Sequence, residues 1–277
     1  MLTVLFASLG SFIEEISSSI IKFETDHKKE SVYTAGFING LFALIVFAAL
    51  AFWKGKFIFV AASLPTFMPK LILEVLQAQM QMLALMKADR STFAFVRNLT
   101  IPLLLLTDLI LGFSVSVNQW IGIAIILAVL MFIFLFHIIE TKGIGYPLFT
   151  AVNAVATISL FKYNTSHFNS VEAEQILTIG VLLIYFFLAA GYFNNENPIY
   201  FLKNKIFLGQ GLAHSIASVL ETFAVYLGNP GIAMAAKRAS AVLAGIISGH
   251  NYFQEKKFGA KLWVSLGLIA GLALLTR

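Results

Sequence analysis

Ten long apolar stretches run through this chain and leave little sequence between them. A helix needs about 20 apolar residues to cross the roughly 30 Å of hydrocarbon in a bilayer. Because only 12% of the residues are charged, a water-exposed surface would be hard to build. We expect an all-α integral membrane protein with ten transmembrane helices, over residues 2–21, 32–52, 67–86, 93–111, 120–139, 144–161, 176–193, 207–227, 232–249 and 258–276.

The two halves of the chain resemble each other. The segment Ile21–His27 (IKFETDH) returns as Phe161–His167 (FKYNTSH), and a shift of 141 positions carries Arg97 onto Arg238. Secondary transporters are commonly built from two related repeats, with the substrate site near the bilayer midplane. The sequence therefore predicts two repeats of five helices, over residues 1–140 and 141–277, and makes transport the first functional hypothesis.

Several other classes of protein fit poorly. The net charge is +5, but Lys and Arg are scattered singly through short loops, which argues against nucleic acid as a partner. The absence of cysteine removes disulfides and thiolate metal sites. The first stretch lacks a basic leader and a small-residue cleavage site, so we expect a retained span and no removable signal peptide. We find neither a G-x-S-x-G elbow nor paired Asp residues on facing spans, so we do not expect an enzyme.

The ends of the two halves carry the pattern of a known family. The second half contains Ala235–Gly245 (AAKRASAVLAG), Phe253–Lys256 (FQEK) and Gly267–Leu272 (GLIAGL). These segments resemble the last two helices of EamA-type permeases in the drug/metabolite transporter superfamily. The first half keeps Arg97–Pro102 and Gln119–Gly122, but its turn at Leu111–Ser116 lacks the family's Glu. The resemblance implies a five-plus-five inverted repeat in the cell membrane and a small metabolite as substrate.

The first predicted span carries two adjacent carboxylates, Glu14 and Glu15, near its centre. An ionisable side chain at the bilayer centre costs at least about 2.5–3.5 kcal/mol, so it usually faces a cavity or a partner. Because two neighbouring carboxylates in a medium of low dielectric constant cannot both ionise cheaply, one of them could carry a proton across the membrane. The alternative is a structural role, with one Glu neutralised by Lys22 or by a basic residue of another helix.

The third predicted span carries a second polar stripe. Lys70, Glu74, Gln77 and Gln81 follow one another at helical spacing. We expect Lys70 to extend its ammonium group to the membrane surface. Glu74, Gln77 and Gln81 are candidates for binding the substrate, and the alternative for the glutamines is hydrogen bonding to another helix.

Arg97, Lys237 and Arg238 are candidates for an anion site. The two arginines are equivalent in the repeat, so they should approach one central cavity, where guanidinium groups bind carboxylate or phosphate in a fork geometry. Structural pairing with an acidic residue inside the bundle is the alternative, and three acids could serve: Glu74, Asp108 and Glu221.

The eighth predicted span places His214, Ser218 and Glu221 on one helix face. This spacing lacks the second His of a zinc-binding H-E-x-x-H motif, so we expect no metal and no other cofactor. His214 and Glu221 could relay protons or bind the substrate, or His214 could simply join two helices.

These observations lead to one main hypothesis and one rival. We expect a monomeric or homodimeric carrier in the lipid bilayer that moves a small polar or charged molecule by alternating access, with proton coupling. The rival is a multi-pass scaffold or receptor that transports nothing. The distribution of Lys and Arg favours both termini outside, whereas the family resemblance implies both inside.

Overall fold

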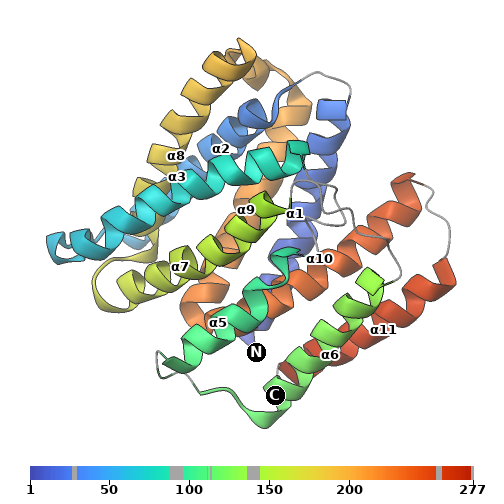
Figure 1. Cartoon of the computed structure of the whole chain (residues 1–277). Coiled ribbons are helices and arrows are strands. Elements are labelled where there is room, and N and C mark those ends of the chain that lie inside the picture. Colours follow the sequence, from blue (N-terminus) through green and yellow to red (C-terminus); the bar gives the residue numbers. More distant parts are fainter. Residues whose placement is uncertain are drawn as a thin grey trace.

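The chain folds into a bundle of long α-helices, and the computed structural model describes residues 1–26, 30–87, 96–110, 112, 114–135, 144–253 and 258–275 (Figure 1). The elements of the first half are α1 (Leu2–Asp26), α2 (Val32–Lys54), the short 3-10 helix η1 (Ala61–Ser63), α3 (Leu64–Lys87), α5 (Thr100–Ile110) and α6 (Val117–Leu135). Those of the second half are α7 (Gly145–His167), α8 (Val171–Asn194), η2 (Pro198–Lys203), α9 (Lys205–Leu227), α10 (Pro230–Phe253) and α11 (Phe258–Leu275). Within these ranges no strand is formed, so the all-α prediction is confirmed.

A described helix overlaps each of the ten predicted stretches. Three of these helices, over Leu2–Ile21, Val32–Lys54 and Val171–Asn194, are long and apolar enough to cross a membrane. Several of the others carry the ionisable and amide side chains of the predicted site, which lowers their mean hydropathy. The family's F-x-x-E-K-like turn at Phe253–Lys256 falls largely outside the described residues.

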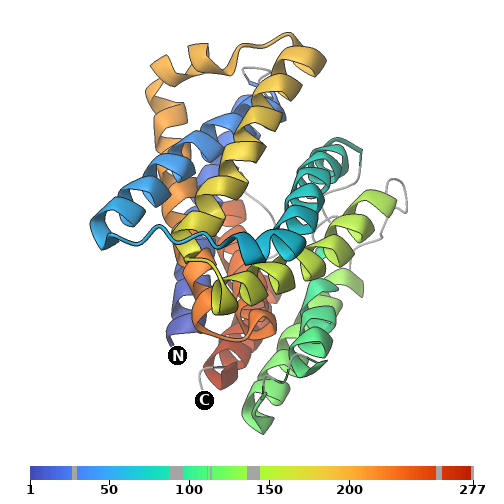
Figure 2. The ribbon, with the colours of Figure 1, turned by 90° about the vertical axis from the view of Figure 1, so that its left-hand side faces the viewer.

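The packing of the helices places α1 at the centre of one part of the bundle. α1 packs against α9 and α10, while α7 packs against α3 and α5. α2 lies along α8, and α6 lies along α11 (Figures 1 and 2). Both chain termini lie at the same end of the molecule in both views.

Short polar residues determine where several helices begin. The side chain of Ser31 accepts a hydrogen bond from the backbone N–H of Thr34 and starts α2. Ser170 does the same for Ala173 at the start of α8, whose first turn also carries two acidic residues, Glu172 and Glu174. A serine cap accepts a hydrogen bond from a backbone N–H group that has no partner inside the helix. Acidic side chains in the first turn stabilise the helix because they lie at the positive end of its dipole.

Glycines bring α6 and α11 into close contact. A Cβ atom at Gly122 would lie 2.8 Å from the carbonyl oxygen of Gly271, and one at Gly271 would lie 2.6 Å from Cγ1 of Ile126. Small residues let membrane helices approach closely, so their packing and backbone contacts hold the helices together.

We therefore expect Gly122→Ala to lower the thermal unfolding temperature, because the new methyl group would push α6 away from the backbone of α11. Overpacking of this kind costs about 1–3 kcal/mol. Gly180→Ala in α8 is the matched control, since its Cβ would meet nothing within 4 Å. If the two variants unfold at the same temperature, the close approach of α6 and α11 does not contribute to stability.

Candidate functional site

An acid and a histidine meet at the middle of the bundle. Glu14 is the central residue of α1 (Leu2–Asp26), and His214 lies close to the middle of α9 (Lys205–Leu227). Nδ1 of His214 lies 2.9 Å from Oε2 and 3.1 Å from Oε1 of Glu14. The two candidates from different predicted spans therefore form one pair near the middle of both helices.

An ion pair lies beside the contact of Glu14 with His214. Glu221 of α9 pairs through Oε2 with the Nζ of Lys237, about two turns into α10. The hydroxyl of Ser11 in α1 donates to the backbone oxygen of Lys237 at 2.8 Å, which ties α1 to the same part of α10. Glu221 also has its side chain against Gly10, where a Cβ atom would lie 2.7 Å from its Cγ.

The two arginines belong to the same group of charges. Arg238 interacts electrostatically with Arg97 and with Glu221, and Arg97 interacts with Glu221 and Glu14. We call these residues the charged cluster. Its members are Glu14, Arg97, His214, Glu221, Lys237 and Arg238. Arg97 and Arg238 are therefore near enough to interact, although 141 positions separate them in the sequence. Of the three acids considered as structural partners, Glu221 is the one that interacts with both.

Some polar atoms of the charged cluster form no hydrogen bond with the described residues around them. Nε of Arg238 and Oε1 of Glu221 are buried and accept or donate no hydrogen bond within the described part of the chain. The same holds for the hydroxyls of Ser17 and Ser240, each one turn from a member of the cluster. The side chains of Glu14 and His214 are 29% and 30% exposed. Such a group can take up a small polar molecule.

The neighbouring carboxylate Glu15 points to another face of α1. Residues that adjoin in a helix are rotated by about 100° from each other, so Glu15 cannot share the position of Glu14. It is half-buried. Glu14 therefore pairs with His214 of α9, while Glu15 projects from another side of α1.

The polar stripe of α3 faces α7 and lies apart from the charged cluster. Nε2 of Gln77 donates to the backbone oxygen of Thr150 at 3.1 Å, and Nδ2 of Asn153 donates to Oε1 of Gln77 at 2.8 Å. Glu74 on the same stripe is half-buried and interacts electrostatically with Lys70. These contacts correspond to the helix-joining alternative for Gln77. Gln81 follows one turn later and is half-buried.

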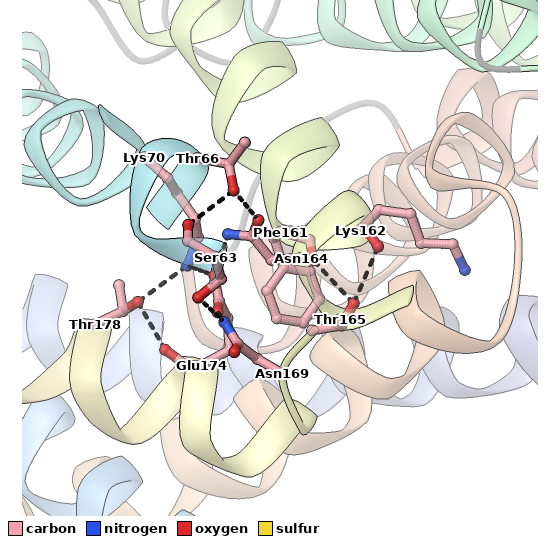
Figure 3. A network of polar contacts seen from close by, with 10 residues as sticks. All are labelled: Ser63, Thr66, Lys70, Phe161, Lys162, Asn164, Thr165, Asn169, Glu174 and Thr178. Atoms are coloured by element: carbon pink, nitrogen blue, oxygen red, sulfur yellow. Dashed lines mark hydrogen bonds and ion pairs between the residues drawn. The ribbon is translucent and has the colours of Figure 1, made fainter. Parts of the chain in front are cut away.

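The prediction that Lys70 reaches the membrane surface is wrong. Lys70 is 1% exposed, and its Nζ lies 3.1 Å from Oε1 of Glu174 and 2.9 Å from Oγ1 of Thr178, to which it donates (Figure 3). The reason is that α8 supplies a buried carboxylate at the same depth. Glu174 was not recognised from the sequence, because it lies in a polar segment that reads as a loop, and only its place four residues after Ser170 marks a helix start.

Two charged side chains contact the backbone on either side of the turn between α9 and α10. Nζ of Lys162 donates to the backbone oxygen of Tyr226 near the end of α9. Oδ2 of Asp108 accepts a hydrogen bond of 2.7 Å from the backbone N–H of Gly231 at the start of α10. Both charges suit the helix ends that they contact. Lys162 and Asp108 therefore fix the relative position of the two helices that carry Glu221 and Lys237.

Comparison with known proteins shows the fold of the chain. No protein-family model matches the chain, and no curated protein matches it. One solved structure, described only as the crystal structure of a protein, superposes with a TM-score of 0.76 over 98% of this chain and 98% of that chain. The two sequences are 14% identical. The chain therefore shares its helical fold, over nearly its whole length, with a protein of very different sequence.

Proposed function

We propose that this protein is a multi-pass carrier of the cell membrane that moves a small polar or charged metabolite by alternating access, and that the charged cluster is its substrate site. The single observation that carries this proposal is the meeting of six ionisable side chains from α1, α9, α10 and the segment before α5 inside a bundle of largely apolar helices. Such residues are costly inside a membrane and mark substrate or ion pathways.

The helix contacts support a five-plus-five inverted repeat of the EamA type. If α1, α2, α3, α5 and α6 correspond in order to α7, α8, α9, α10 and α11, the partners of α1 correspond to the partners of α7. The pairs α2 with α8, α5 with α10 and α6 with α11 each join equivalent helices. This pattern is what two related halves packed around a pseudo-two-fold axis would produce.

The charges of the cluster favour an anionic group on the substrate. Arg97, Lys237 and Arg238 face two carboxylates, and His214 adds a further positive charge when it is protonated. Cations therefore outnumber carboxylates among the described members of the cluster. Glu14 and His214 are the groups best placed to bind and release a proton during the cycle, which would couple transport to a proton gradient.

Two measurements on the purified, full-length protein test this function. Small carboxylates, phosphates and neutral polar molecules are screened for thermal stabilisation, because a compound that binds the native state raises its apparent stability with concentration. A stabilising compound is then tested for uptake and counterflow in proteoliposomes. We expect accumulation or counterflow of at least one anionic compound. Stabilisation without any movement across the bilayer would favour the rival function, a receptor or scaffold in which the polar pairs only join helices.

A further inference from the structure

The two ends of α2 and α8 are closed by connectors from different halves of the chain. α2 and α8 run antiparallel, because Lys54 at the end of α2 contacts Glu172 at the start of α8, whereas Ser31 before α2 contacts Glu196 after α8. With about 1.5 Å per residue, helices of this length separate the two ends by roughly 35 Å. We call these the Lys54 end and the Ser31 end.

At the Lys54 end, the connector between α2 and α3 is hydrogen-bonded to the corner between α7 and α8. The backbone N–H of Ser170 donates to the carbonyl oxygen of Ile58 at 2.9 Å, and the N–H of Ile58 donates to Oγ of Ser170 at 3.2 Å. The N–H of Val60 donates to Oδ1 of Asn169 at 3.0 Å. The two halves of the chain thus join directly at this end.

Beneath these connectors lies a buried ion pair with a complete set of partners (Figure 3). The side chains of Lys70 and Glu174 are 2% and 0% exposed. Both oxygens of Glu174 are used, since Asn164 donates to Oε1 at 2.9 Å and Asn169 donates to Oε2 at 2.7 Å. Asn169 also donates to Oγ of Ser63 at 3.0 Å, and Thr66 donates to Asn164. This network joins α3 and η1 of the first half to α7 and α8 of the second.

The Ser31 end is held by different chemistry. Oε2 of Glu196 accepts hydrogen bonds from the backbone N–H of Ser31 at 3.2 Å, from its hydroxyl at 2.6 Å and from the hydroxyl of Thr34. All these donors are neutral. If α1, α2 and α3 correspond to α7, α8 and α9, the connectors at the two ends are equivalent. The connector between α1 and α2 corresponds to the one between α7 and α8, and the connector between α2 and α3 corresponds to the one between α8 and α9. The Lys70–Glu174 pair lies at the Lys54 end, whereas the contacts described for Glu196 at the Ser31 end are hydrogen bonds from neutral groups.

We infer that the Lys70–Glu174 pair is a latch that holds the Lys54 end closed and that must separate when the substrate passes there. A buried charge that loses its partner is strongly destabilised, so the closed arrangement persists only while both charges are present. Separation would let water reach each charge. A cavity of about 350 Å³, lined by Asn169, Ser170 and Glu172 among others, already lies next to the network. This inference rests on the proposed function, because only a carrier needs an end that opens.

Distance measurements between spin labels test the latch directly. The natural chain has no cysteine, so Ile58→Cys and Ser166→Cys introduce the two labelling sites. Both positions are exposed, Ile58 on the connector between α2 and α3 and Ser166 in the last turn of α7. We expect a short distance as the main population, with any open form a minor one of about 0.1–10%. Lys70→Met and Glu174→Gln should each make the longer distance the main population.

Two further variants keep the test decisive. Glu196→Gln changes a carboxylate at the Ser31 end and should leave the label distance unchanged. Thr178→Val removes a hydrogen-bond acceptor of Lys70 while Lys70 and Glu174 stay paired. This variant should therefore fold even if the charge variants do not. It should raise the open population less than they do. Folded Lys70→Met, Glu174→Gln or Thr178→Val protein with the distance distribution of the parent would overturn the latch. The measurement needs no substrate, so a failure of transport would count against the proposed function alone.

Discussion

Glu14→Gln should abolish the accumulation of substrate driven by a pH gradient, while the protein still folds and still exchanges substrate in counterflow. Glutamine keeps the size of the side chain and can hydrogen-bond to His214, but it cannot bind and release a proton. Because Glu14 lies at the middle of α1 and 2.9 Å from Nδ1 of His214, it is the carboxylate best placed to carry the proton of the cycle. Uptake into proteoliposomes with and without an imposed pH gradient measures the effect.

Glu15→Gln provides the comparison, since it changes the adjacent carboxylate on another face of the same helix. An equal loss in both single variants would mean that the two acids share the proton. If Glu14→Gln, Glu15→Gln and the double variant all accumulate substrate normally under a pH gradient, the proton-carrier role is wrong. Size-exclusion profiles and unfolding temperatures show whether each variant is folded.

Most of the fold could be predicted from the sequence, because the length and spacing of apolar stretches depend on local composition alone. The second stretch was expected over residues 32–52, and α2 spans Val32–Lys54. α8 shows where this approach fails. Its start was expected at residue 176, whereas the helix begins at Val171, because its first turn contains two glutamates and reads as a loop. A serine followed by acidic residues is the usual start of a helix, and this signal was available.

The residues of the charged cluster are easier to single out from the sequence than the partners that each of them contacts. Placing an ionisable side chain inside a membrane costs free energy, so such a residue in an apolar stretch usually faces a cavity or a partner. This argument singles out Glu14, His214 and Arg238. Pairing is a long-range property: Glu14 and His214 are 200 residues apart, and nothing in the sequence joins them. The same limit explains Lys70, whose place near the start of a span suggested the membrane surface until its partner on α8 was known.

Replacing Arg238 by Ala should weaken substrate binding about 10-fold to 100-fold, and Arg97→Ala should act in the same direction. Each change removes a charge-assisted hydrogen bond worth about 1.5–3 kcal/mol. Arg238 supports this expectation because its Nε is buried and makes no hydrogen bond within the described residues. Its guanidinium interacts electrostatically with Arg97 and Glu221. Titration of the stabilising compound, followed by thermal unfolding or calorimetry, gives the affinity.

The lysine variants separate substrate binding from structural pairing. Arg238→Lys keeps the positive charge beside Glu221 but loses the planar fork that binds an anion through two parallel hydrogen bonds. If the guanidinium binds the substrate, Arg238→Lys should fold normally and still bind weakly. If it only neutralises Glu221, Arg238→Lys should bind at full affinity, whereas Arg238→Ala should lose stability. Unchanged affinity in folded Arg97→Ala would remove Arg97 from the site and leave Arg238 and Lys237 as its cations.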